Sequence, residues 1–209
     1  MQIELHHTGK KYQREWIFRE VNAQWKSGAR IAIVGGNGSG KSTLAQIVSG
    51  FLSSSEGEVS WNLHQSNITR DKLYTHVSLC TPLMQLWDDF TLAENFELLS
   101  RFKATRGQLT LAEFAAMIGL EHVKHRTLKH YSSGMRQRVK LGLAILADTP
   151  LLILDEPCSH LDASAISWYQ QLLESHAENR TIIVASNNDT QELFLCTEQI
   201  DITSYKPQA

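Results

Sequence analysis

Cysteine is scarce in this chain of 209 residues, and its placement excludes several kinds of site. Cys80, Cys158 and Cys196 lie far apart, and no pair has the spacing of a metal site or a redox motif. We therefore expect reduced thiols in a cytosolic protein. The nine histidines form no ligand set either, because none has carboxylate or cysteine partners at metal-site spacing.

Long apolar runs and an excess of charge are also missing. No stretch approaches the roughly 18–20 apolar residues that cross a bilayer, and residues 1–6 lack the apolar core of a signal peptide. We therefore expect no direct membrane insertion, so that any membrane role acts through a separate partner chain. The net charge of -2 gives no electrostatic reason to expect nucleic acid as a partner.

A glycine-rich segment directly after the apolar run Ile31–Val34 indicates nucleotide binding. Its pattern, G-x-x-x-x-G-K-S/T, is typical of the phosphate-binding loop of nucleoside triphosphatases. Glycines let successive backbone N–H groups point inward to hold an anion, and the helix expected from Lys41 adds the positive end of its dipole. Lys41 is predicted to reach the β and γ phosphates, and Ser42 to bind Mg²⁺. The residues predicted to bind the nucleotide here are Gly35, Gly36, Asn37, Gly38, Ser39, Gly40, Lys41, Ser42 and Thr43.

Two carboxylates follow a second apolar run, Leu151–Leu154. Ligands bind at the carboxyl ends of strands in open α/β sheets. Asp155 is therefore predicted to hold Mg²⁺, and Glu156 to activate the attacking water as a general base. A strand-end Asp-Glu pair alone serves equally often to cap a turn, and it is the phosphate loop that favours the catalytic role.

The apolar pattern indicates an α/β fold with a helical insertion. Residues 1–34 contain alternating polar and apolar stretches typical of partly exposed strands. From about 85 to 131, apolar residues recur at helical spacing, and capping-box sequences begin at Thr91 and Thr110. Three continuous apolar runs are typical of parallel strands that are covered on both faces. They are Ile31–Val34, Leu151–Leu154 and Thr181–Ala185.

Together with these motifs, three further segments make the whole chain resemble the ATP-binding cassette (ABC) ATPases. Tyr12 matches the aromatic residue that stacks on adenine, and Ser132–Arg138 resembles the signature motif Leu-Ser-Gly-Gly-Gln. Ser159–Asp162 resembles the loop that crosses the dimer interface. The resemblance implies a phosphate-loop NTPase with a RecA-like, mainly parallel sheet, an N-terminal antiparallel β sub-domain and an inserted helical sub-domain. It predicts one ABC ATPase domain over residues 1–209, with 1–84 and 136–209 as the core and about 85–135 as the helical sub-domain.

The signature residues Ser132, Ser133, Gly134 and Met135 also have a physical reason to bind an anion. Ser132, Ser133 and Gly134 precede a predicted helix, and a helix N-terminus attracts anions. Taken alone, Ser-Ser-Gly before a helix is more often a plain N-cap. In the family architecture the signature binds the γ-phosphate held by a second subunit, and Asp162 lies at that interface. The resemblance thus implies a head-to-tail homodimer that encloses two ATP molecules.

The chain departs from the family pattern at positions that affect hydrolysis. Pro82 stands where the family has a glutamine that senses Mg²⁺, and Gln85 is a candidate substitute from the next turn. Asn187 replaces the catalytic switch histidine; it can still donate a hydrogen bond to a γ-phosphate but cannot become a cation near neutral pH. Met135 and Ser133 replace the glutamine and first glycine of the signature. These changes are expected to affect the hydrolysis rate more than ATP binding.

The predicted function is that of the ATP-binding and hydrolysing subunit of an ABC transporter. Separately encoded transmembrane subunits would be its partners and would hold it at the cytoplasmic, inner face of the membrane. The apolar stretch Leu83–Trp87 would dock them, unless it is ordinary core. The alternative is an ATP-gated dimerising regulatory or clamp protein with little hydrolysis. A cytosolic ABC protein that works on ribosomes or DNA is disfavoured, because this chain has one head, no long coiled coil and little net charge.

Overall fold

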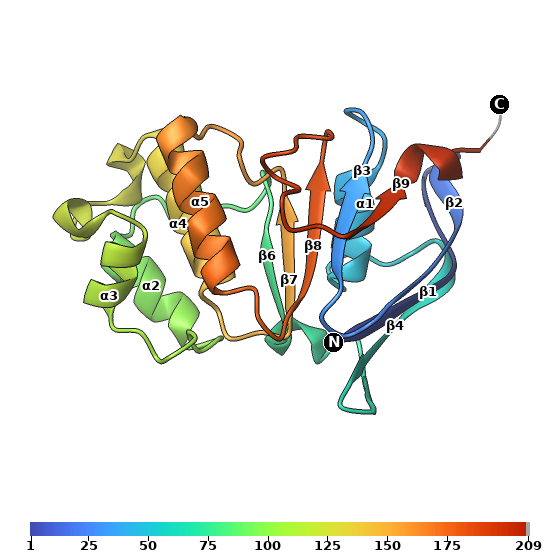
Figure 1. Cartoon of the computed structure of the whole chain (residues 1–209), viewed down its shortest axis with the longest axis horizontal. Helices are drawn as coiled ribbons and strands as arrows, with labels where there is room; N and C mark the ends of the chain where they lie inside the picture. The colour runs from blue at the N-terminus through green and yellow to red at the C-terminus, as the bar shows by residue number, and fades with distance from the viewer. Residues whose placement is uncertain (208–209) are drawn as a thin grey trace.

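A five-stranded parallel sheet forms the centre of the computed structural model, which describes residues 1–207 (Figure 1). Its strand order is β6-β7-β8-β3-β9, and every neighbouring pair is parallel. The three central strands are the three apolar runs of the sequence, so that prediction is confirmed. The strands are β3 (Arg30–Val34), β6 (Val77–Cys80), β7 (Leu151–Asp155), β8 (Thr181–Ser186) and β9 (Glu198–Asp201).

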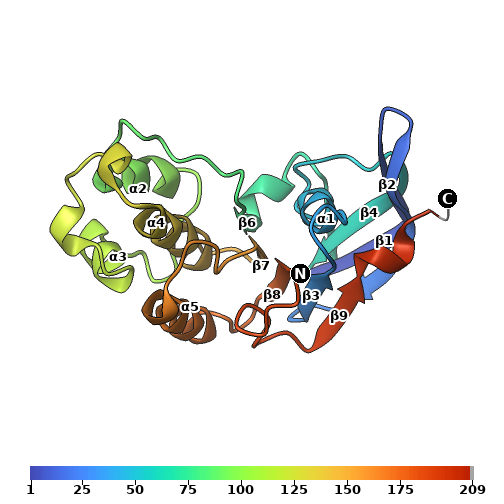
Figure 2. The same ribbon diagram turned by 90° about the horizontal axis from the view of Figure 1, so that it is seen from above.

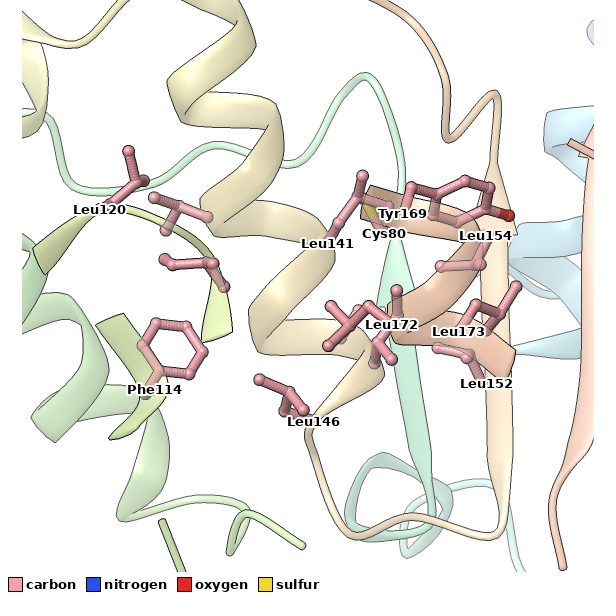
Figure 3. Close-up of a cluster of buried hydrophobic side chains, with 14 of the residues drawn as sticks. Cys80, Phe114, Leu120, Leu141, Leu146, Leu152, Leu154, Tyr169, Leu172 and Leu173 are labelled. Atoms are coloured by element: carbon pink, nitrogen blue, oxygen red, sulfur yellow. The ribbon is translucent and has the colours of Figure 1, made fainter. Parts of the chain in front are cut away.

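Strands β7 and β8 each contribute to two separate hydrophobic cores, because successive side chains of a strand point to opposite faces. In β7, Leu152 and Leu154 join the core formed with the helices, and Figure 3 shows them beside Tyr169, Leu172 and Leu173. Leu151 and Ile153 of the same strand enter the other core, which holds helix α1 and the N-terminal strands. Burial on both faces explains why the first four residues of β7 are all apolar.

A four-stranded antiparallel sheet lies beside the parallel one, with the order β2-β1-β4-β5 (Figure 1). Its apolar side chains pack into the core that contains α1, and its polar side chains are exposed. This arrangement confirms the partly exposed strands predicted for the N-terminal segment. The strands are β1 (Gln2–Tyr12), β2 (Glu15–Trp25), β4 (Glu56–Leu63) and β5 (Ser66–Ile68).

The helices divide between the two faces of the parallel sheet. Helix α1 lies between the two sheets, whereas the other four helices lie on the far side (Figure 2). Both predicted capping boxes are present, at Thr91 before α2 and at Thr110 before α3. The helices are α1 (Lys41–Val48), α2 (Leu92–Ser100), α3 (Leu111–Met117), α4 (Ser133–Ile145) and α5 (Ala163–Ser175), with 3-10 turns at Leu73–Thr75, Glu121–Val123, Leu128–His130 and Ile202–Tyr205. Within residues 1–207, no helix has both the length and the apolar character needed to cross a membrane.

Candidate functional site

The predicted phosphate loop connects the carboxyl end of β3 to the first turn of α1. Gly40 precedes the helix with φ 107°, and a Cβ there would lie 2.6 Å from the Ile17 side chain, so both its backbone angle and its neighbour require glycine. Lys41 is the first residue of α1 and is buried. Its ammonium group donates to the Gly36 carbonyl at 3.0 Å and to Asn187 Oδ1 at 2.5 Å. The loop therefore curls around a buried cation.

The two predicted metal ligands, Ser42 and Asp155, are in contact at the end of this loop. Asp155, at the end of β7, accepts a hydrogen bond from the Ser42 hydroxyl at 3.1 Å. Its side chain is only 1% exposed, and this burial raises the pKa of Asp155 to about 6, against the lowering effect of the Ser42 hydrogen bond. Glu156 follows with φ 48°, a left-handed angle that is uncommon for glutamate, and its N–H donates to the Ala185 carbonyl at 2.9 Å.

Asn187 joins the loop to the carboxylates. It lies one residue beyond β8, where the carboxyl end of that strand faces the phosphate loop. Besides accepting from Lys41, its amide donates to Asn37 Oδ1 at 2.7 Å and, more weakly, to Glu156 Oε1 at 3.4 Å. The structure thus brings together Lys41, Asn37, Glu156 and Asn187, which are separated by up to 150 positions in the sequence.

A cavity of about 290 Å³ lies beside Lys41, Asn37 and Glu156, and Asn187 is not among its lining residues. Ile17, the phosphate loop from Asn37 to Thr43 and Glu156 line it. Sequence reasoning missed Ile17, which is the extra residue of a β-bulge: Lys10 pairs with Phe18 and Lys11 with Trp16 across the strands. The sequence carries no mark of that bulge. Tyr12, predicted to stack on adenine, does not line this cavity; it is half exposed at the end of β1, with the Lys10 ammonium 5.2 Å from its ring centre.

The donor set fits a magnesium nucleotide. Lys41 supplies a buried cation for phosphate, and the buried hydroxyl of Ser39 has no hydrogen-bond partner among the described residues. The Ser42 hydroxyl and the Asp155 carboxylate are oxygen ligands of the kind that Mg²⁺ takes alongside phosphate oxygens.

The signature residues lie elsewhere. Ser132 caps α4, accepting from the Met135 N–H at 3.2 Å, and both Ser132 and Ser133 are exposed. Helix α4 packs on the face of the parallel sheet opposite α1, so this helix end and the phosphate loop belong to different sides of one chain. Asp162 caps α5 by accepting from the Ala165 N–H at 2.8 Å, and its hydrogen bonds hold the pKa of Asp162 below its usual value.

Pro82 and its candidate substitute Gln85 lie in the irregular segment between β6 and α2. Both are exposed, and they line a cavity of about 430 Å³ together with Ser133 and His160. The Pro82 carbonyl accepts from Lys140 Nζ at 3.4 Å. Neither residue lines the cavity over the phosphate loop, whereas both share a cavity with residues of helix α4.

The chain is similar in sequence to proteins of one known family. The model of the ABC transporter family matches residues 18–159. The cytochrome c biogenesis ATP-binding export protein CcmA of Nitrosospira multiformis is 32% identical over 182 residues, which cover 85% of this chain and 86% of that protein. An ATP-dependent lipid A-core flippase of Mannheimia succiniciproducens is 34% identical over 170 residues, which cover 77% of this chain but 29% of the flippase.

Solved structures show the same fold. A dimeric ATP-binding cassette in a post-hydrolysis state, bound to ADP and Pi, superposes with a TM-score of 0.81 at 24% identity, over 96% of this chain and 95% of that one. An ATP-binding protein of a putative ABC transporter from Pyrococcus furiosus gives a TM-score of 0.80 at 18% identity, over 99% of this chain and all of that one. At these identities the likeness concerns the fold, and it confirms the predicted fold class.

Proposed function

The chain belongs to the ABC transporter family as an ATP-binding ATPase, and we propose that it powers a transporter by forming an ATP-dependent sandwich dimer with a second copy of itself. The observation that carries this proposal is the separation of two anion-binding helix ends. The phosphate loop has Lys41 and Asp155 beside it within the chain, whereas the start of α4 is exposed and lies on the opposite face of the parallel sheet. Residues 1–84 and 136–209 would form the catalytic core, and about 85–135 the helical sub-domain.

The geometry suggests a division of tasks in hydrolysis. Lys41 and the loop N–H groups would bind the β and γ phosphates, with Tyr12 at the adenine end. Ser42 and Asp155 would hold Mg²⁺, which neutralises phosphate charge when bound. Glu156 would accept a proton from the attacking water, a task worth roughly 10²–10⁴-fold in rate. Asn187 touches both Lys41 and Glu156, so it would fix the orientation of the cation and the base toward each other.

The partner copy would complete the site. Its Ser132, Ser133, Gly134 and Met135 would approach the γ-phosphate through backbone N–H groups and hydroxyls at the start of α4. Asp162 would stabilise the loop at the same interface, because it holds the first turn of α5. Release of phosphate would remove the charge that links the two copies, and the dimer would open.

Separately encoded transmembrane subunits would dock beside the helical segment and hold this chain at the cytoplasmic face of the membrane. Phe51 and Leu83 are 76% and 77% exposed, an unusual state for large apolar side chains. Phe51 and Tyr74 line a shallow cavity of about 370 Å³ together with Lys103. The stretch Leu83–Trp87 is divided, since Leu86 packs against the helical core while Leu83 and Trp87 are exposed.

The alternative role, an ATP-gated clamp with little hydrolysis, is favoured by one specific observation. Pro82 and Gln85 line the cavity beside α4 and not the cavity over the phosphate loop, so no glutamine amide of that segment lines the phosphate-loop cavity. A sandwich dimer would then form with ATP but open slowly, because little ATP would be hydrolysed. The ATPase rate separates the two roles.

The dimer is tested with Glu156→Gln, which keeps the shape of the side chain but cannot accept the proton. We expect this variant to lose about 10²–10⁴-fold in turnover and to elute as a dimer with ATP in size-exclusion chromatography. A variant that stays monomeric while the wild type dimerises contradicts the sandwich.

Docking is tested by co-purification of the chain with transmembrane subunits from detergent extracts. A Phe51→Ser and Leu83→Ser double variant should abolish this co-purification without loss of ATP binding.

A further inference from the structure

One peptide unit, between Pro157 and Cys158, is held at both of its polar atoms by buried side chains. The Pro157 carbonyl accepts a hydrogen bond from Gln137 Nε2 at 2.9 Å. The Cys158 N–H donates to Glu192 Oε1 at 3.0 Å. Gln137 is 7% exposed and Glu192 is 6% exposed, so both contacts are shielded from water. This peptide unit begins one residue after Glu156.

The two side chains come from segments that carry other functional groups. Gln137 lies in α4, the helix capped by Ser132. Glu192 lies in the turns that follow β8 and Asn187, and its own backbone is anchored. Its N–H donates to the Asp189 carbonyl at 3.1 Å, and its carbonyl accepts from the Tyr169 hydroxyl at 3.4 Å. The contacts therefore connect the signature helix, the segment after Asn187 and the loop after Glu156 in one place.

Glu192 places a buried carboxylate beside the Cys158 N–H. No ion pair among residues 1–207 involves Glu192. Burial raises the pKa of Glu192, and so does the charge of Asp189, while hydrogen bonds from Ser186 and the Cys158 N–H act in the opposite direction. A buried carboxylate without a cation is unfavourable for simple packing, and its cost is offset only by the hydrogen bonds that it accepts.

Glu156 needs such support because its backbone angle is uncommon. With φ 48°, it is left-handed, and a residue in that region keeps its conformation only where its surroundings hold it. On one side the Glu156 N–H donates to Ala185, and on the other its carbonyl accepts from the Ser159 N–H at 3.1 Å. We infer that Gln137 and Glu192 are positioning residues, which fix the Pro157–Cys158 peptide and thereby aim the Glu156 carboxylate. This inference rests on the proposed role of Glu156 as general base.

The test compares four variants of the full chain by steady-state ATPase kinetics and by amide hydrogen exchange at Cys158. Glu192→Ala and Gln137→Ala each remove one contact with the peptide, and Glu192→Gln keeps an oxygen that can accept from Cys158. Gln170→Ala is the matched control, since Gln170 Nε2 donates to the neighbouring Gln191 carbonyl at 3.0 Å but does not touch the peptide.

We expect Glu192→Ala and Gln137→Ala to lower kcat by about tenfold to a hundredfold, because small misplacements of a catalytic group cost rates of this size. The KM for ATP should change less than twofold, since Lys41 and its loop are untouched. Glu192→Gln should recover most of the lost rate, and Gln170→Ala should match the wild type. Amide exchange at Cys158 should accelerate at least tenfold in Glu192→Ala. It should stay close to the wild-type rate in Glu192→Gln and in Gln170→Ala.

Three results would overturn the inference. One is an unchanged kcat in both Glu192→Ala and Gln137→Ala. Another is a fall in kcat in the control Gln170→Ala that is as large as the fall in Glu192→Ala and Gln137→Ala. The third is unchanged Cys158 exchange in Glu192→Ala, a readout that needs no turnover. If Glu192→Ala does not fold, Gln137→Ala and Glu192→Gln still decide. A wild type that binds ATP without hydrolysing it contradicts the proposed function instead, and the exchange measurement then judges the contact by itself.

Discussion

The two helix starts predicted to meet ATP differ sharply within one chain. At the start of α1, Lys41 and Asp155 are 4% and 1% exposed, and each already has hydrogen-bond partners. At the start of α4, Ser132 and Ser133 are exposed, and the Ser132 hydroxyl serves the helix itself. The first site is built by folding alone. The second is an open helix end whose proposed ligand is held by another copy of the chain.

The aspartates at the phosphate site and at the start of α5 differ in a similar way. Burial raises the pKa of Asp155 at the phosphate site, whereas hydrogen bonds from the start of α5 lower the pKa of Asp162. A buried acid held for a metal is costly until the metal neutralises it, while a cap stabilises its own helix at once. Asp155 is therefore a buried acid that its surroundings do not stabilise as an anion, whereas Asp162 is an exposed acid that its own helix stabilises as an anion.

The largest expected effect comes from Lys41→Ala. This change removes the buried cation of the phosphate site, so ATP affinity should fall at least about a hundredfold, the scale of losing a buried charge partner. Calorimetry with Mg²⁺ present measures it. The start of α4 should be unaffected, and unchanged affinity would show that the loop is not the phosphate site.

Asp155→Asn should make the metal-free protein more stable at pH 7.5. A carboxyl whose pKa is raised from 3.8 to about 6 binds its proton more tightly in the folded state, so its contribution to stability falls as pH rises between these values. Above pH 6 the ionised group costs about 1–3 kcal/mol, which asparagine avoids. Thermal melting at pH 7.5 and at pH 4.5 is the measurement. The gain should shrink at the lower pH, and an equal gain at both would show that ionisation of Asp155 is not its cause.

Ser132→Ala probes the open helix end. Loss of the cap should destabilise the protein by about 1 kcal/mol. ATP affinity of the dilute monomer should not change, but turnover at dimer-forming concentrations should fall. Thr110→Ala is the control, because it removes the cap of α3 at a comparable cost without touching either site. If Thr110→Ala slows turnover as much as Ser132→Ala does, the effect belongs to stability and not to the interface.

The smallest expected effect is that of Asn187→His. Charge-assisted hydrogen bonds are roughly twice as strong as neutral ones, so a histidine that contacts the γ-phosphate should raise turnover severalfold with little change in ATP affinity. Single-turnover and steady-state rates between pH 6 and 8 measure it. A slower variant would show instead that this site depends on the contacts of Asn187 with Lys41 and Asn37.

Much of the fold followed from local patterns. The three apolar runs predicted the central strands because burial on both faces leaves a continuous hydrophobic sequence. The capping boxes at Thr91 and Thr110 predicted two helix starts because each satisfies its N–H groups with neighbouring residues. The phosphate loop could be predicted for the same reason, since its glycines, Lys41 and Ser42 are adjacent in the chain.

What the sequence determined by itself is therefore the set of parts whose physics is local: strands, caps, the glycine-rich loop and the strand-end carboxylates. Tertiary structure alone decided how distant polar groups pair, because a hydrogen bond between residues 150 positions apart leaves no periodicity to detect. The position of Asn187 at the end of an apolar strand could be predicted from the sequence, but its hydrogen bond to Asn37 could not. Ile17 lines the cavity because a β-bulge places it there. Gln137 and Glu192 bind the same peptide unit because α4 and the turns after β8 pack against the same loop.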